Sequence, residues 1–139
     1  MKLPINSIAH INTLGHLEVG RYDLLDIARK IDCPFYIYFA SAIEERYKRL
    51  KSLLPENMDI CYAVKANPNR EILTLFKNLK STFDISSGGE FSRCMDAGIS
   101  PQKISFSGPG KGYEELSEAI RNNVFAISVE SLREIDEII

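Results

Sequence analysis

Short apolar runs alternate with longer segments of helical periodicity along most of this chain of 139 residues. The runs are rich in β-branched and aromatic residues and lie between turn-forming residues, which is typical of strands. The segments between them carry apolar side chains three or four positions apart, which predicts helices. The predicted strands are 35–39, 60–65, 82–85, 103–107 and 124–129, and the predicted helices are 41–54, 69–80, 90–97, 113–122 and 131–139.

The order of these elements predicts an α/β fold. Strand and helix alternate at a spacing of roughly twenty residues, which indicates βαβ units around a parallel sheet. Such a sheet can stay open and doubly wound, or it can close into a (β/α)8 TIM barrel of about 250 residues. Because the last helix has no stop signal, we favour the first part of a barrel and keep the open sheet as the alternative.

Composition and charge narrow the classes of partner. Hydrophobic residues make up 45% of the chain and charged residues 26%, which is typical of a globular protein. The formal charge of −2 favours neither nucleic acid nor an anionic membrane as a partner. No stretch approaches the roughly 20 apolar residues of a membrane span. Cys33, Cys61 and Cys94 are odd in number and far apart, so we expect reduced thiols and a cytoplasmic location.

Lys65 and Asp84 are the first candidates for chemistry. Lys65 ends the predicted strand 60–65, and reactive groups of barrels and open sheets gather at the carboxyl ends of strands. A half-buried amine there loses its proton more readily and can attack an aldehyde. Asp84 lies in the next strand and can orient that amine or contact a polar cofactor. Equally, Lys65 can be a lysine whose head reaches solvent, and Asp84 a residue that caps its loop.

Two glycine-rich turns, 87–89 and 107–112, each precede a predicted helix. The free amides of a helix N-terminus attract anions, so a phosphate site is one interpretation and plain turn chemistry the other. The second turn lacks the spacing of a P-loop, and the chain has no dinucleotide fingerprint. His10 and His16 are not part of any metal-ligand cluster in the sequence.

Four segments, taken together, resemble the fold-type III pyridoxal phosphate enzymes, the family of diaminopimelate, ornithine and arginine decarboxylases. The resemblance covers nearly the whole chain from about Val19 onward, and Ser-Gly-Gly-Glu at 87–90 is closest to the diaminopimelate branch. The segments are, in order, Cys33-Pro34-Phe35-Tyr36-Ile37-Tyr38, Tyr62-Ala63-Val64-Lys65-Ala66-Asn67, Phe83-Asp84-Ile85-Ser86-Ser87-Gly88-Gly89-Glu90 and Phe106-Ser107-Gly108-Pro109-Gly110-Lys111.

The resemblance implies a cofactor, a reaction and a set of site residues. Pyridoxal 5′-phosphate is held by Lys65 as a Schiff base, and Ala63 and Asp84 match positions that line the cofactor. A small amino acid displaces Lys65 and loses its carboxylate as carbon dioxide while the cofactor ring stores the electrons. The protein is then a carboxy-lyase on a barrel of the alanine racemase type, and family members commonly form homodimers.

The resemblance also implies that the chain is incomplete. Residues 1–34 belong to a second, β-rich domain, and residues 35–139 form the first part of the pyridoxal-phosphate-binding barrel. The ring-stacking histidine, the phosphate loop and the glutamate that faces the ring nitrogen are expected further along, so we expect these 139 residues alone not to decarboxylate. Two alternatives stay open: an amino-acid racemase on the same barrel, and a non-catalytic cofactor-binding or regulatory paralogue.

Overall fold

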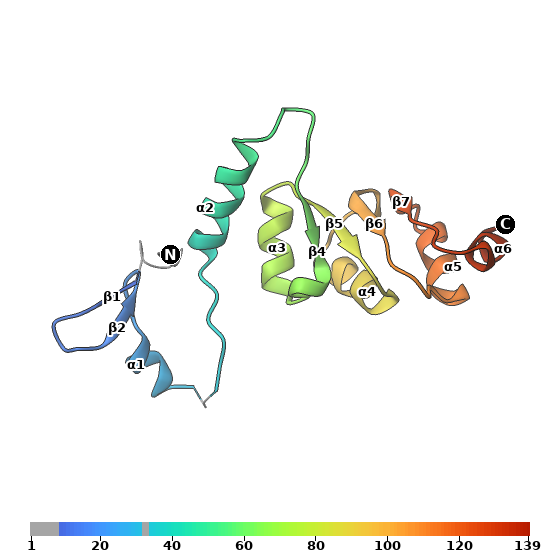
Figure 1. The fold of residues 1–139 in the computed structure, drawn as a ribbon. Helices are drawn as coiled ribbons and strands as arrows, with labels where there is room; N and C mark the ends of the chain where they lie inside the picture. The colour runs from blue at the N-terminus through green and yellow to red at the C-terminus, as the bar shows by residue number, and fades with distance from the viewer. Residues whose placement is uncertain (1–8, 32–33) are drawn as a thin grey trace. The chain divides into compact units, whose positions relative to one another are not determined.

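The computed structural model describes residues 9–31 and 34–139 (Figure 1). The chain divides into two compact units, Met1–Ala42 and Ile43–Ile139. Each unit has its own sheet, so each is described by itself. Cys33, one of the three cysteines considered above, lies outside the described residues.

The first unit contains a small antiparallel sheet followed by a short helix. Its strands are β1 (Ala9–Ile11), β2 (Leu17–Val19) and β3 (Tyr22–Asp23), paired in that order, and α1 (Leu24–Ala28) follows. Asp23 caps α1 by accepting a hydrogen bond from the amide of Leu25, and its other oxygen lies 2.7 Å from Nδ1 of His16. These contacts connect the β1–β2 turn, the last strand and the helix.

The strand predicted at 35–39 is wrong, because this segment is in neither a strand nor a helix. Its aromatic and β-branched composition suits a strand, yet a strand also needs a neighbour for its backbone hydrogen bonds. Within the part of the chain that the structure describes, no strand pairs with it. Tyr36 and Tyr38 are accordingly exposed.

The second unit is built around four parallel strands, β4 (Cys61–Ala63), β5 (Thr82–Ile85), β6 (Ile104–Phe106) and β7 (Ala126–Ile127). They lie side by side in chain order (Figure 1). A doubly wound sheet reverses its strand order at a switch point, whereas a barrel adds each strand next to the last. The observed order therefore agrees with the predicted first part of a barrel.

One helix precedes the parallel sheet and a helix follows each of its strands, close to the predicted positions. They are α2 (Ala40–Lys51) before the sheet, then α3 (Arg70–Asn78), α4 (Gly88–Asp96), α5 (Tyr113–Arg121) and α6 (Leu132–Ile138), with 3-10 turns η2 (Val64–Ala66) and η3 (Pro101–Lys103). Asn69 caps α3, and Gly98 follows α4 with a φ of 68°, which suits a helix C-terminus. The helix predicted to begin at residue 41 begins at Ala40.

The sheet has one covered face and one open face. Phe83, Ile85, Ile104 and Phe106 are at most 1% exposed and pack against helix residues such as Leu73. Burying a side chain of this size stabilises a fold by about 1.5–3 kcal/mol, so this layer holds the unit together. The opposite face carries small or polar side chains that are partly or fully exposed: Cys61, Ala63, Thr82, Asp84, Ser105 and Ala126. In a barrel, that face is the interior.

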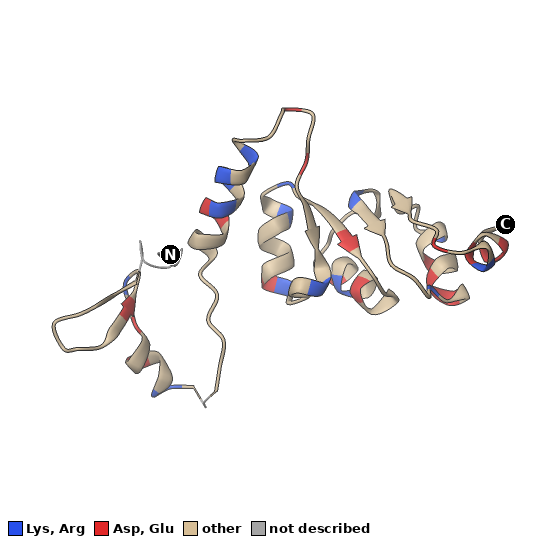
Figure 2. Cartoon of the chain, in the orientation of Figure 1, with Lys and Arg blue, Asp and Glu red and all other residues tan. Residues whose placement is uncertain are grey.

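Charge is distributed very unevenly between the helices and the sheet. Figure 2 shows basic and acidic positions on the helices, while among the four parallel strands only β5 carries a charged position. That position is Asp84, on the open face. Among the described residues, no helix has the length and apolar character needed to cross a membrane.

Candidate functional site

The carboxyl ends of β4, β5 and β6 bring the predicted site residues to one edge of the sheet. Ala63 of β4 is the register partner of Asp84 in β5, and Asp84 is the partner of Ser105 in β6. Register partners in adjacent parallel strands point to the same side, so these three side chains share the open face. Lys65 follows Ala63 by two residues, in the turn η2.

Lys65 has a fixed backbone and a free side chain. Val64 beside it is completely buried, and the Tyr62 hydroxyl donates to the carbonyl of Asn67 across the turn at 3.1 Å. The side chain of Lys65 is exposed and makes no hydrogen bond or ion pair with the described residues. Of the two interpretations of the sequence, the half-buried amine is therefore wrong and the exposed lysine is confirmed, because Lys65 stands in a turn beyond the last paired residue of β4.

Asp84 is held by a residue that the sequence did not single out. The Ser107 hydroxyl donates to Oδ2 of Asp84 at 2.9 Å, and the Ser107 amide donates to the carbonyl of Ile85 at 2.8 Å. Both bonds join the loop after β6 to the end of β5. The sequence showed Ser107 as the first residue of a glycine-rich turn, but not which strand end that turn would meet.

Carboxylates of the protein already occupy several amides in the two glycine-rich turns. Glu115 accepts from the amide of Gly88 at 2.6 Å and from that of Gly112 at 3.1 Å. A Cβ at Gly88 would lie 3.2 Å from the Glu115 side chain, so the absence of a side chain there admits the carboxylate. Glu90 accepts from the amide of Ser86 at 2.7 Å. These amides are not available to a phosphate, which favours the interpretation as turns.

A buried ion pair anchors the second glycine-rich turn. Lys111 Nζ lies 3.1 Å from Oε2 of Glu134, and the two side chains are 1% and 3% exposed. Lys111 also donates to the carbonyl of Gly108. The hydrogen bond from the backbone amide of Glu130, and then the hydrogen bond from the Lys111 side chain, hold the pKa of Glu134 below its usual range, against the opposing effect of burial. The sequence did not reveal this pair, although Ser131 and Glu134 have the spacing of a capping box.

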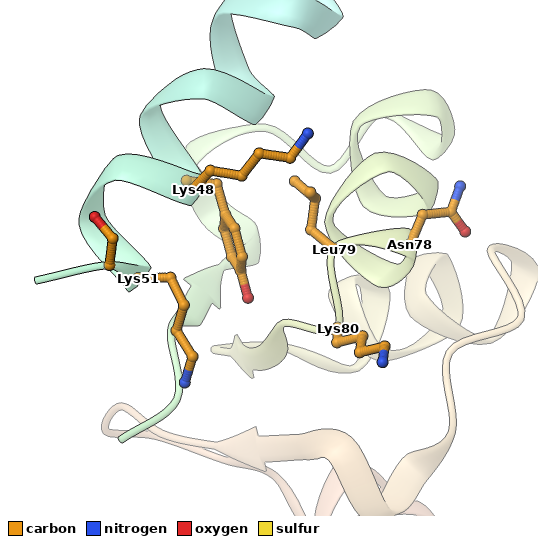
Figure 3. Close-up of a pocket in the computed structure, with 7 residues that line it drawn as sticks. Lys48, Lys51, Asn78, Leu79 and Lys80 are labelled. Carbon is orange, nitrogen blue, oxygen red and sulfur yellow. The ribbon is translucent and has the colours of Figure 1, made fainter. Parts of the chain in front are cut away.

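A hollow of about 460 Å³ opens between the last turns of α2 and α3 (Figure 3). Lys48, Lys51 and Lys80 line it, which could suggest an anion site. However, Lys48 pairs with Glu44 at 3.4 Å and Lys51 with Asp59 at 3.2 Å. Lysines in the last turns of helices also neutralise free carbonyls, and this hollow is at the amino end of the strands. It is therefore not part of the candidate site.

The remaining cysteine and histidine side chains do not extend the site. Cys94 is completely buried and Cys61 is exposed at the start of β4. His10 lies 3.8 Å from Glu18, and His16 pairs with Asp23 in the first unit. Among the described residues, no three His, Cys, Asp or Glu side chains come together as metal ligands.

The residues at this edge fit the attachment end of pyridoxal phosphate. The free amine of Lys65 can condense with an aldehyde, and Oδ1 of Asp84 accepts no hydrogen bond from the described residues. Ala63 and Ser105 are small and leave space on the open face beside Asp84. Fewer hydrogen-bond donors are free to bind the phosphate of the cofactor, because the carboxylates of Glu90, Glu115 and Glu134 already accept hydrogen bonds from nearby backbone amides.

Comparison with protein families agrees with this fit. Residues 40–139 match the family described as pyridoxal-dependent decarboxylase, pyridoxal binding domain. Among curated relatives, a diaminopimelate decarboxylase of Aquifex aeolicus is 36% identical over 122 residues, which are 88% of this chain and 29% of that protein. One from Helicobacter pylori is 42% identical over 106 residues, which are 76% of this chain and 26% of that protein. The chain thus spans less than a third of the length of these relatives.

Solved structures show the same arrangement of elements. A crystal structure from Aquifex aeolicus matches with a TM-score of 0.90 at 33% identity, covering 97% of this chain and 33% of that one. Diaminopimelate decarboxylase from M. jannaschii, in complex with L-lysine, matches with a TM-score of 0.85 at 29% identity, covering 99% and 33%. A lysine decarboxylase with pyridoxal phosphate and cadaverine matches with a TM-score of 0.76 at 31% identity, covering 83% and 30%.

Proposed function

The chain belongs to the pyridoxal-dependent decarboxylase family, and from this premise we propose that it supplies the cofactor-attachment part of an amino-acid decarboxylase. Lys65 holds pyridoxal 5′-phosphate as a Schiff base, and Ala63 and Asp84 line the cofactor. The substrate class is an amino acid, and the similarity to diaminopimelate decarboxylases favours diaminopimelate within that class.

One observation carries the proposal: an unpaired amine stands at the carboxyl end of the first parallel strand, beside a held carboxylate. A lysine that makes an ion pair has to give up that partner before it can react. Lys65 has no partner among the described residues, so its amine can reach a carbonyl without that cost. The buried Lys111 offers the contrast, because Glu134 and Gly108 already hold its amine.

Three residues of this chain would have different roles at the cofactor. When bound, the cofactor supplies the electron sink for loss of a carboxylate. Lys65 would attach it and, once released by the substrate amine, carry a proton at Nζ. Asp84 would present Oδ1 toward the bound group, with Oδ2 held by Ser107. Ala63, the register partner of Asp84, would leave space for a flat ring on the open face.

Other parts of the enzyme must come from outside these residues. We propose that residues 1–34 join a second, β-rich domain and that 35–139 begin the barrel, as the resemblance implies. The phosphate loop and the partner of the ring nitrogen would lie in the remainder of the relatives' length, which is more than two thirds of it. We further propose a cytoplasmic homodimer, in keeping with the common assembly of this family.

The test is an activity assay on the full natural chain loaded with pyridoxal phosphate. We expect carbon dioxide release from diaminopimelate and loss of that release in Lys65→Ala, with Lys103→Ala as the matched control on an exposed lysine remote from the site. Inversion at the α-carbon of the amino acid without release of carbon dioxide would show a racemase instead. Cofactor binding with neither reaction would show a non-catalytic binder. The 139-residue chain alone should bind weakly and release no carbon dioxide.

A further inference from the structure

We propose that Ser107 is a positioning residue that holds the carboxylate of Asp84 in the orientation required at the cofactor site. The inference rests on the proposed function and deepens it, because it assigns a role to a side chain outside the lysine motif. Ser107 lies after β6, and Asp84 lies in β5, so the contact joins two neighbouring strand ends.

The contact has the chemistry of an orienting bond. A hydroxyl that donates to a carboxylate makes a charge-assisted hydrogen bond, which is roughly twice as strong as a neutral one. The bond of 2.9 Å occupies Oδ2 of Asp84 and fixes the plane of its carboxylate. Oδ1 accepts no hydrogen bond from the residues that the structure describes, so it is left for a bound group.

The loop that carries Ser107 is itself held in place. Gly108, the next residue, has a φ of 93°, a conformation that L side chains rarely adopt, and it turns the chain sharply away from β6. Its carbonyl accepts from Lys111 Nζ, which in turn pairs with Glu134 in a fully buried contact. The Ser107 hydroxyl is therefore presented to Asp84 by a rigid loop, which is how a positioning residue has to be supported.

Ser107 makes a separate structural contact that a substitution of its hydroxyl would spare. Its backbone amide donates to the carbonyl of Ile85 at 2.8 Å and continues the pairing of the two strands. That bond survives in Ser107→Ala, because it involves no side-chain atom. The hydroxyl bond to Asp84 is thus the contact that the variant removes, and the two roles can be tested apart.

The experiment compares variants of the full natural chain loaded with pyridoxal phosphate. The variants are Ser107→Ala, Ser107→Thr, Asp84→Asn and the double variant Ser107→Ala/Asp84→Asn. The matched control is Ser92→Ala, on an exposed serine whose hydroxyl bonds only to the carbonyl of Gly88. For each protein, the cofactor dissociation constant, kcat, KM and thermal unfolding are measured.

We expect Ser107→Ala to weaken cofactor binding or to lower kcat/KM by about tenfold, with unchanged thermal unfolding. Ser107→Thr should restore most of the loss, because it keeps the hydroxyl. In the Asp84→Asn background, Ser107→Ala should add almost nothing, since its effect passes through Asp84. The Ser92→Ala control should match the natural protein in every measurement.

Three results would overturn the inference: an unchanged Ser107→Ala variant, no recovery in Ser107→Thr, or fully additive losses in the double variant. Each of these presupposes that the natural protein binds the cofactor at Lys65. If the natural protein takes up no pyridoxal phosphate, the proposed function itself fails, and that outcome is seen before any variant is compared.

Discussion

At the scale of single residues, the thiols of Cys61 and Cys94 differ strongly in burial. Cys94 is completely buried between α4 and the sheet, and burial, followed by the nearby charge of Glu90, raises the pKa of its thiol to about 12. Cys61 is exposed on the open face of the sheet. Because the thiolate is the reactive form, Cys61 is expected to react faster than Cys94 in the folded 139-residue chain.

Alkylation at neutral pH tests this difference. A soluble maleimide should modify Cys61 rapidly and Cys94 only after the protein is unfolded in denaturant, as followed by mass spectrometry of the peptides. The control is Cys61→Ser, in which alkylation of Cys94 is measured without any reaction at residue 61. Equal rates at the two thiols in the folded protein would show that the layer around Cys94 is not closed.

The site residues were predictable from the sequence only in part. Lys65 and Asp84 stand within local motifs, and the alternation of elements was enough to place both at strand ends. The partners of Asp84 and Lys111 lie 23 residues away from them in each case, and no local pattern fixes such distances. The sequence left open whether Lys65 is half-buried or exposed, because that depends on where strand pairing stops.

At the scale of elements, the predictions succeeded where local signals and packing agree. The strands of the second unit alternate with amphipathic helices, and caps such as Asn69 mark where helices begin. Strand 35–39 failed because its composition could not reveal that it lacks a paired neighbour. The helix predicted to begin at residue 41 begins one residue earlier, at Ala40.

The cap of α3 gives a stability test at this scale. Asn69 Oδ1 accepts from the amide of Glu71 at 2.9 Å, so Asn69→Ala should lower the free energy of unfolding by about 1 kcal/mol. Urea unfolding followed by circular dichroism measures the change. Asn78→Ala, on an exposed position in the last turn of the same helix, should leave stability within about 0.5 kcal/mol. Equal effects of the two substitutions would contradict the capping role.

The small sheet of the first unit should be sensitive to acid. The hydrogen bond from His16, more than any other contact, lowers the pKa of Asp23 below its ordinary value. A carboxyl with a lowered pKa stabilises the fold above its unfolded pKa of about 3.9 and loses that contribution as the pH falls through the lower, folded pKa. The β1–β3 sheet should therefore loosen below about pH 4.

Amide hydrogen exchange across the β1–β3 sheet, measured from pH 6 down to pH 2.5, follows this loss. Asp23→Asn should remove most of the dependence on pH, while Asp26→Asn, an exposed acid in α1, should keep it. The same acid dependence in Asp23→Asn as in the natural protein would assign the effect to another group.

At the scale of the whole molecule, the open face of the second unit connects fold and function. Helices cover one side of the parallel sheet, and the other side presents small side chains with Asp84 as its only charge. The edge where β4, β5 and β6 end carries Lys65, Asp84 and Ser107 together. The order and register of the strands thus bring together Lys65, Asp84 and Ser107, which belong to three separate segments of the sequence.

The most direct test of cofactor attachment at Lys65 is reductive labelling of the full natural chain. The protein is mixed with pyridoxal phosphate, reduced with borohydride and digested, and the modified lysine is identified by mass spectrometry. We predict one labelled site, Lys65, and none in Lys65→Arg, whereas Lys103→Arg should label as the natural protein does. A label on Lys111 or any other lysine, or no label at all, would contradict this assignment.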